Sequence, residues 1–451
     1  MPMELLNSLF RPGVGPQAFT PEATIQALLD VEAALAWAEA DVGVILPAAA
    51  EAIAAHCRVE RIDLPRLAAD AAQAGNLAIP LVRQLTALVA TDDAVAAGFV
   101  HWGATSQDIL DTALVLQLRR ALAGIAADLD SLIELCAERC AQHRGEIMAG
   151  RTWLQQAPPI TLGLKLASLL DALLRQRERL RQLRPRLLTL QLGGAVGTLA
   201  ALQPHGLAVA EQMARRLDLA APDLPWHSQR DRLAELACWC ALLCGTLGKL
   251  GRDVSLSMQT EIAELCEPEQ AGRGGSSSMP HKRNPVASAV MLAAAARAPG
   301  LAATLLTAQV QEQERGLGGW HAEWETLPEL LCLCAGALRQ AVELLRGLEV
   351  RPDAMRRNLA ASCGLIMAEA VTMALGERLG RSRAHQLVAE CCQQARLRGE
   401  DLADALRGHP ELSALLSHDE LSTLLEPSQN LGAADAMVAR VLRRYRERTD
   451  E

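Results

Sequence analysis

The chain has 451 residues, enough for roughly two to four domains, and 50% of them are hydrophobic while only 2% are aromatic. A core of alanine, leucine and valine with few β-forming residues predicts an all-α fold. The net charge of −9 excludes a general nucleic-acid-binding protein, which needs a basic surface, so an anionic ligand requires a local basic pocket.

The N-terminal part of the chain, residues 1–110, contains short helical patterns. They are interrupted by three prolines, Pro47, Pro65 and Pro80. Proline breaks helical periodicity or marks the first turn of a new helix. We therefore predict a first domain of several short helices.

The middle of the chain, residues 111–350, is dominated by long helical patterns. They cover 113–144, 159–188, 229–264, 285–313 and 322–347. In the third, an apolar residue recurs every three or four positions from Leu233 to Met258. Helices this long cannot bury their apolar stripes within one compact subunit, which predicts a bundle with surface left for partner subunits. After Arg351-Pro352 the helices shorten again, so residues 351–451 form a predicted C-terminal domain.

The first polar segment that can carry chemistry is His101-Trp102-Gly103-Ala104-Thr105-Ser106-Gln107-Asp108, just before the first long helix. Thr105 and Ser106 offer hydroxyl and backbone N–H groups that suit a carboxylate ligand. The alternative is a simple helix cap, in which Ser106 or Asp108 only starts the helix.

Three further loops contain groups that bind carboxylates. Arg151, in Gly150-Arg151-Thr152-Trp153, can pair with a carboxylate through two hydrogen bonds. The segment His227-Ser228-Gln229-Arg230-Asp231 begins the third long helix, where His227 can be a cap and Asp231 a surface ion-pair partner instead. Arg315 is the candidate anion ligand in the loop between the last two long helices.

The most informative segment is Gly275-Ser276-Ser277-Ser278-Met279-Pro280-His281-Lys282-Arg283-Asn284-Pro285. Glycines and a proline precede it, which predicts a loop, and Asn284 can cap a helix that starts at Pro285. Lys282 and backbone N–H groups at a helix N-terminus suit an anion. The alternative interpretation is a polar linker between two helices.

Four of these segments resemble, in the same order along the chain, those of the fumarase/aspartase superfamily: His101–Asp108, Gly150-Arg151-Thr152, Gln229-Arg230-Asp231 and the serine-rich segment. The resemblance spans nearly the whole chain. It implies a three-domain all-α fold and a homotetramer around a bundle of about twenty long helices. It also implies active sites shared between subunits, and β-elimination or its reverse next to a carboxylate.

The resemblance also implies residue roles. Ser276 is the implied acid/base at Cα, with Ser277 as an alternative, and Lys282 stabilises the aci-carboxylate. A serine alkoxide needs such cationic and N–H neighbours. The implied substrate-binding residues are His101, Thr105, Ser106, Arg151, Trp153, Gln229, Asn284 and Arg315.

Within the superfamily, the chain is similar to the adenylosuccinate lyases and to the bacterial 3-carboxy-cis,cis-muconate cycloisomerases. The lyase motif Gly-Arg-Thr-His carries an acidic histidine where this chain has Trp153, and Asn76 aligns roughly with a second lyase histidine. A nitrogen leaving group needs a proton donor, whereas a carboxylate leaves as a stable anion. The substitution favours the cycloisomerases and a small tricarboxylate substrate; adenylosuccinate lyase or another β-elimination lyase is the alternative, ahead of a non-enzymatic scaffold.

The twelve cysteines lack the spacing of a metal site or a disulfide framework. Pairs such as Cys136/Cys140 and Cys240/Cys244 lie four residues apart within apolar helical patterns. We expect core thiols in a reducing cytoplasm, with no metal, no cofactor and no membrane or nucleic-acid partner. The apolar stretch from Val286 to Leu306 contains Arg297, Pro299 and Gly300, which favours a bundle helix over a membrane span.

Overall fold

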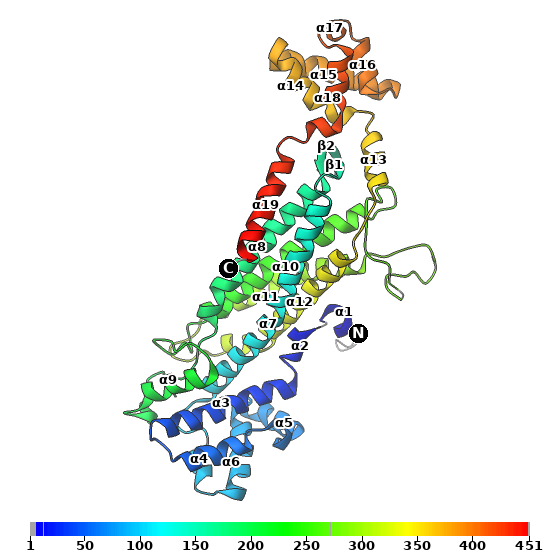
Figure 1. The fold of residues 1–451 in the computed structure, drawn as a ribbon. Coiled ribbons are helices and arrows are strands. Elements are labelled where there is room, and N and C mark those ends of the chain that lie inside the picture. Colours follow the sequence, from blue (N-terminus) through cyan, green and yellow to red (C-terminus); the bar gives the residue numbers. More distant parts are fainter. Residues whose placement is uncertain (1–5, 12, 271, 450–451) are drawn as a thin grey trace. The chain divides into compact units, whose positions relative to one another are not determined.

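The computed structural model describes residues 6–11, 13–270 and 272–449. Helices dominate it, and the strands form two small two-stranded sheets (Figure 1). The predicted all-α fold class is confirmed. The chain divides into two compact units: unit 1 comprises residues 1–130, 176–248 and 290–340, and unit 2 comprises 131–175, 249–289 and 341–451. The predicted three-domain division at residues 110 and 350 follows a different criterion and stays a prediction.

The five predicted long helices are present, and each contributes residues to both units. Their bounds are α7 Ser106–Gln142, α8 Leu162–Leu187, α10 Asp231–Ser257, α11 Val286–Thr307 and α12 Gly319–Arg346. All starts and ends lie within seven residues of the predicted ranges. The largest differences are the earlier start of α7 and the earlier end of α10, whereas α8 starts three residues later than predicted because a strand precedes it.

The remaining elements of unit 1 are short except for α3, which has 21 residues. They are α1 Asn7–Phe10, α2 Val14–Gln17, α3 Pro21–Asp41, α4 Pro47–His56, η2 Val59–Arg61, α5 Leu64–Ala74, α6 Ala78–Asp92, η3 Ala96–Phe99, η4 Ala200–Leu202 and α9 Gly206–Leu217. The prolines that break the sequence pattern lie in first turns: Pro47 opens α4, Pro65 is the second residue of α5, and Pro80 is the third residue of α6. Helix α3 packs on α4 and α9, and a continuous aliphatic core fills the space between them (Figure 1).

Unit 2 contains both sheets and the C-terminal helices. Its elements are β1 Ile147–Thr152, β2 Gln155–Thr161, β3 Leu265–Cys266, β4 Glu349–Val350, α13 Pro352–Ala360, η5 Leu365–Met367, α14 Ala368–Leu379, α15 Arg381–Arg398, α16 Leu402–Gly408, α17 Pro410–Ser413, α18 His418–Leu425, η6 Pro427–Asn430 and α19 Ala434–Thr449. Helices α14, α15, α16 and α18 enclose a second aliphatic core (Figure 1). The antiparallel pair β1–β2 was not predicted; its sequence lacks the alternation that marks a strand.

Two long helices carry unusually apolar sequences. By length and composition alone, α10 and α11 are each sufficient to cross a membrane. The chain itself buries 61% of the apolar window in α10 but only 33% of that in α11. The side of α11 that includes Ala296, Ala303 and Leu306 is exposed in the single chain. This uncovered apolar side matches the predicted surface for partner subunits, and the assembly itself stays a prediction.

Candidate active site

The ten predicted site residues fall into two groups, five in each compact unit. Unit 1 holds His101, Thr105, Ser106, Gln229 and Arg315. Unit 2 holds Arg151, Trp153, Ser276, Lys282 and Asn284. Each group is described by its own contacts.

Thr105 and Arg315 are in contact in unit 1, although 210 residues separate them in the sequence. The Arg315 guanidinium donates a 2.9 Å hydrogen bond to Thr105 Oγ1. Ser106 is the first residue of α7, so its backbone belongs to the helix N-terminus. The Arg315 guanidinium, two hydroxyls and a helix N-terminus thus lie close together in space, a combination that suits a carboxylate.

Asp108 fixes the start of α7. Its Oδ2 accepts hydrogen bonds from the backbone N–H of Thr105 at 3.0 Å and of Gly194 at 2.9 Å. Its Oδ1 accepts from the Gly193 N–H at 2.9 Å and lies 2.7 Å from Nε2 of His227. Asp108 is fully buried, so these four contacts replace the water it would otherwise bind. His227 is therefore part of this buried cluster rather than a cap of α10.

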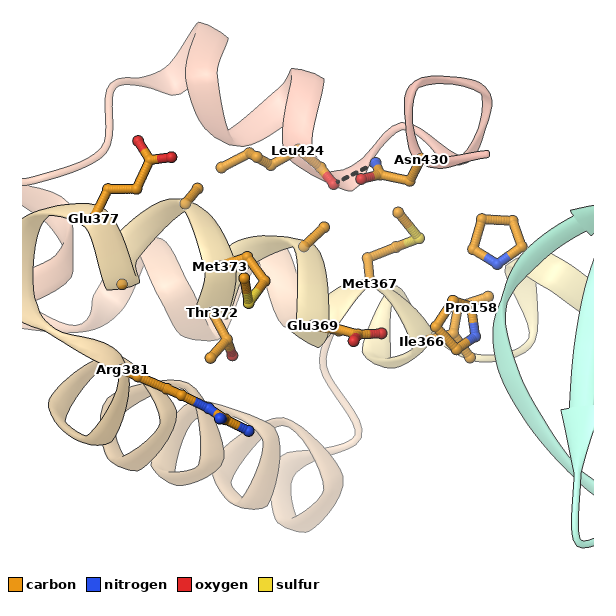
Figure 2. A pocket seen from close by; sticks show the side chains of 14 residues that line it. Pro158, Ile366, Met367, Glu369, Thr372, Met373, Glu377, Arg381, Leu424 and Asn430 are labelled. Atoms are coloured by element: carbon orange, nitrogen blue, oxygen red, sulfur yellow. Dashed lines mark hydrogen bonds between the residues drawn. The ribbon is translucent and has the colours of Figure 1, made fainter. Parts of the chain in front are cut away.

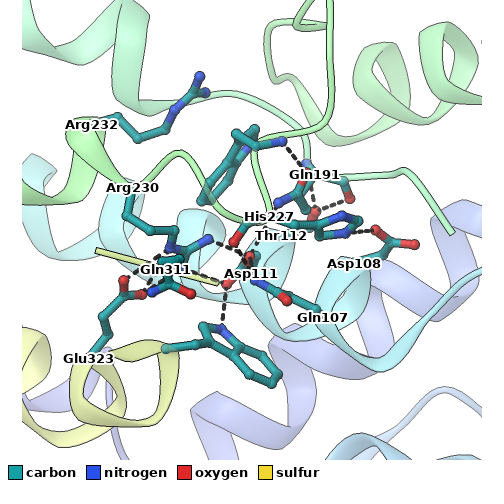
Figure 3. Close-up of polar contacts among 12 residues, drawn as sticks. Gln107, Asp108, Asp111, Thr112, Gln191, His227, Arg230, Arg232, Gln311 and Glu323 are labelled. Carbon is teal, nitrogen blue, oxygen red and sulfur yellow. Dashed lines mark hydrogen bonds and ion pairs between the residues drawn. The ribbon is translucent and has the colours of Figure 1, made fainter. Parts of the chain in front are cut away.

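A buried ion network lies beside Asp108 and includes Arg230, which is only 2% exposed (Figure 3). Arg230 donates to both oxygens of Asp111 at 2.7 and 3.0 Å, and to Glu323 of α12 at 3.0 Å from Nε. The Trp320 indole N–H donates to Asp111 Oδ1 at 3.1 Å. The network joins α7, the loop before α10 and the start of α12, and it holds exposed Gln229 next to buried Arg230.

The two carboxylates of this network differ in protonation tendency. Burial would raise the pKa of Asp111, but the charge and hydrogen bonds of Arg230 hold that pKa below its usual value. Burial raises the pKa of Glu323, and Arg230 only partly offsets this. The charge of Arg230 therefore favours the ionised form of Asp111, while Glu323 is the carboxyl that takes up a proton more readily.

Trp153 lies at the tip of the β1–β2 hairpin in unit 2. Trp153 and Leu154 form its two-residue turn with φ values of 52° and 65°, the left-handed conformation of a type I′ turn. Such turns favour Asn-Gly, yet here the two apolar side chains are 96% and 79% exposed. Two large apolar side chains are thus exposed to solvent in a backbone conformation that costs energy, and the predicted role of Trp153 in substrate binding stays a prediction.

Arg151, two residues before this turn, is held by Glu264. Two hydrogen bonds of 2.7 and 2.8 Å join its guanidinium to the Glu264 carboxylate, whose side chain is fully buried. Asn358 donates a third hydrogen bond to the same carboxylate at 2.8 Å. The predicted two-pronged pairing thus exists within the chain, and substrate binding by Arg151 stays a prediction.

The serine-rich loop is folded around the oxygen of Ser276. Ser276 Oγ accepts hydrogen bonds from the backbone N–H of Met279 at 3.1 Å and of Ser278 at 3.4 Å. Asn284 closes the loop, since its N–H donates to Gly274 O at 2.8 Å and its amide to Gly275 O at 3.3 Å. Donors aimed at a hydroxyl oxygen lower the cost of its negative charge.

The helix after this loop is capped differently from the prediction. Helix α11 begins at Val286, and its first N–H groups bind Glu267, not Asn284. Glu267, which is buried, accepts from Ala287 N at 2.9 Å and from Ser288 N and Oγ at 2.8 and 2.7 Å. These N–H groups are therefore occupied, and Lys282, which is exposed, is the remaining anion-binding group predicted there.

The chain matches two protein-family models. Residues 16–300 match the family described as Lyase, and residues 364–441 match the one described as Adenylosuccinate lyase C-terminus. The chain belongs to the fumarase/aspartase superfamily. It is 55% identical to a 3-carboxy-cis,cis-muconate cycloisomerase of Pseudomonas aeruginosa, over 97% of this chain and 96% of that protein.

Other superfamily members are similar as well. A crystal structure of a 3-carboxy-cis,cis-muconate lactonizing enzyme from Pseudomonas putida has a TM-score of 0.94 and 50% identity, covering 99% of this chain and all of that one. A nitrosuccinate lyase of Streptomyces davaonensis is 42% identical over 94% of this chain and 91% of its own length. The predicted superfamily is thus confirmed, together with its all-α fold.

Sequence reasoning missed most of the carboxylates that hold the superfamily residues in place. Glu32, Glu264 and Glu323 are each buried and each contacts a residue of a predicted site segment, while buried Glu267 contacts Ala287 and Ser288 just after the serine-rich segment. Glu32 lies in an apolar helical pattern, Glu264 and Glu267 follow α10 without a motif, and Glu323 lies close after the loop that contains Arg315. The available signal was a charged residue at a position where helical periodicity requires an apolar one, as at Glu32 in α3.

Unit 2 also contains a cavity that other residues line (Figure 2). It has a volume of about 890 Å³ and is lined by α14 residues such as Met373 together with Pro158 and Arg381. In Figure 2, Leu424 and Asn430 face α14 from one side, joined by a 3.0 Å hydrogen bond. None of the ten predicted site residues lines this cavity, so it supports no part of the proposed reaction.

Proposed function

We propose that the chain is a 3-carboxy-cis,cis-muconate cycloisomerase, which forms 4-carboxymuconolactone in protocatechuate breakdown. The observation that carries this proposal is the near-full-length identity of 55% to a relative of that name. The tryptophan at the hairpin tip agrees with it, because a reaction that neither expels nor adds an amine needs no histidine acid there. Adenylosuccinate lyase is the weaker alternative for the same reason.

The reaction is an internal addition. One oxygen of a substrate carboxylate forms a C–O bond to a carbon of the conjugated alkene, the π bond of that C=C breaks, and its electron pair on the neighbouring Cα takes a proton. We assign that proton to the hydroxyl of Ser276. The alkoxide left on Oγ accepts the hydrogen bonds of the Met279 and Ser278 N–H groups and then regains a proton from water.

Cationic and polar groups hold the charge of the substrate. Thr105 and Arg315 are assigned to one carboxylate because they already contact each other. Lys282, exposed on the serine-rich loop, is assigned to the carboxylate next to Cα, where negative charge develops. Ser106, Gln229 and Asn284 supply polar contacts, while Arg151 and Trp153 form the wall at the hairpin tip.

The working enzyme is proposed to be a cytoplasmic homotetramer with active sites shared between subunits. Support for association comes from α11, whose apolar window is 33% buried in the single chain. Support for a reducing compartment comes from the twelve cysteines, all of which are free thiols. Size-exclusion chromatography with light scattering tests the assembly directly.

An ultraviolet assay tests the activity. The purified protein is incubated separately with 3-carboxy-cis,cis-muconate, adenylosuccinate and nitrosuccinate. We expect loss of the diene absorbance with the first compound and no reaction with the second. Nitrosuccinate is included because nitrite would leave as an anion without protonation, so the Trp153 argument alone does not exclude it. Faster turnover of adenylosuccinate or nitrosuccinate than of the muconate refutes the proposal.

A further inference from the structure

His101 is held in an unusual way for a residue between two helices. Its backbone has φ of 61°, a left-handed conformation that costs energy for a residue with a Cβ. Its ring Nδ1 lies 2.7 Å from Oε1 of Glu32, 69 residues earlier on α3. The Glu32 side chain is 1% exposed and that of His101 is 18% exposed. The left-handed backbone and the buried Glu32 carboxylate thus fix the Nδ1 edge of the imidazole ring.

A second buried carboxyl group, that of Glu39, lies on the same helix as Glu32. Glu39 lies two turns further along α3, is fully buried, and both of its oxygens lack a hydrogen-bond partner among the described residues. Burial, with the charge of Glu32, raises the pKa of Glu39 to about 9. Glu39 is therefore neutral at physiological pH.

We propose that Glu32 is a positioning residue of the active site, which holds His101 as an imidazolium whose Nε2–H binds a substrate carboxylate. The Nδ1 contact fixes the ring and its charge, so Nε2 is the nitrogen that remains for a ligand. This inference rests on the proposed function, because a tricarboxylate provides the anion. It adds a third cation to Lys282 and Arg315.

The two carboxylates around His101 favour its protonated form. Burial opposes the charge, but Glu32 on α3 and Asp108 on α7 together raise the pKa of His101 above its usual value. Arg315 approaches the same segment at Thr105, and its positive charge opposes the protonation of His101. The nearest carboxylate, at 2.7 Å, outweighs these more distant effects.

The test is the pH dependence of kcat/KM for Glu32→Gln. Glutamine keeps an acceptor for Nδ1–H and removes only the charge. The imidazolium is then lost at lower pH, so the alkaline limb of kcat/KM moves to lower pH. We expect kcat/KM to fall about tenfold at pH 8, mainly through KM, and to approach that of the wild type near pH 6.

Glu39→Gln is the matched control, since it makes the same chemical change on the same helix at a carboxyl that is already neutral. Its pH profile is expected to superimpose on that of the wild type. His101→Gln is expected to lose the alkaline limb, and adding Glu32→Gln to it is expected to change the profile no further. A Glu32→Gln variant that loses kcat equally at every pH, or that keeps the wild-type profile, overturns the inference.

Two further results keep the test decisive. If Glu32→Gln does not fold, the pH dependence of competitive inhibition by propane-1,2,3-tricarboxylate is compared between wild type and His101→Gln; identical curves overturn the inference. Wild-type inactivity on 3-carboxy-cis,cis-muconate refutes the proposed function instead. An active wild type with an unmoved Glu32→Gln profile refutes only the role of Glu32.

Discussion

Replacing Glu267 by glutamine tests how the serine-rich loop is anchored. Glu267 is 4% exposed and accepts three hydrogen bonds from Ala287 and Ser288 at the start of α11. Glutamine has nearly the same shape, but its NH₂ group must face one of these N–H donors. The substitution therefore leaves a buried N–H without an acceptor and removes the negative charge at the helix N-terminus.

The magnitude follows from these two losses. An unsatisfied buried donor costs about 1–3 kcal/mol. The lost interaction of a partly buried charge with the helix dipole adds about 1 kcal/mol. The total of about 2–4 kcal/mol, in a compact unit of about 200 residues, corresponds to a fall in Tm of roughly 5–10 °C.

Thermal unfolding followed by circular dichroism measures this effect, with Glu269→Gln as the control. Glu269 lies two residues away, its side chain is 81% exposed, and its nearest cation, Arg283, is 4.0 Å distant. We expect its Tm to change by less than about 1 °C. Equal Tm values for the two variants would show that Glu267 does not carry the cap, and the reasoning about the loop anchor would fail.

Three other predictions concern the proposed reaction and the buried acids. Ser276→Ala should lower kcat about 100- to 10,000-fold without changing the oligomer seen by size-exclusion chromatography, whereas Ser277→Ala should stay within about threefold of wild type; the reverse order would reassign the acid. Arg315→Lys keeps the charge but loses the guanidinium fork, so KM measured in the diene assay should rise about tenfold with a smaller effect on kcat. The pKa of Glu39, about 9 in the folded chain against 4.5 as its ordinary value, makes the free energy of unfolding decrease as pH rises between these values. Glu39→Gln should therefore raise Tm at pH 7–8 by an amount that vanishes near pH 4.5; a pH-independent effect would contradict a neutral Glu39.

Much of the architecture could be predicted because helical periodicity is a local signal. The stripe from Leu233 to Met258 lies almost entirely within α10, which ends at Ser257. The β1–β2 hairpin escaped prediction because its strands read Ile-Met-Ala-Gly-Arg-Thr and Gln-Gln-Ala-Pro-Pro-Ile-Thr, without alternation. Its turn, Trp153-Leu154, also lacks the Asn-Gly signal of a type I′ turn.

The candidate site also has a part that local sequence signals predict and a part that depends on residues distant in the sequence. Motifs identified loops such as the one around Ser276, whose own backbone forms its hydrogen bonds. The partners of the charged residues come from distant positions: 69 residues separate His101 from Glu32, and 113 separate Arg151 from Glu264. Nothing local in a single sequence joins such pairs, because tertiary packing alone decides which buried carboxylate meets which cation.

The ion pairs between basic residues and carboxylates of the chain decide which basic residues can bind a tricarboxylate. Three predicted site residues are basic, Arg151, Lys282 and Arg315, and the serine-rich segment also contains Arg283. Two of them, Arg151 and Arg283, are bound to carboxylates of the chain through hydrogen bonds of 2.6–3.1 Å. A substrate must displace those partners to use them, at the cost of leaving a carboxylate unpaired. Arg315 contacts only the hydroxyl of Thr105 among the described residues, and Lys282 is exposed. In the proposed function, these two residues and the imidazolium proposed for His101 are the three positive charges assigned to the three carboxylates of the substrate, in a chain whose net charge is −9.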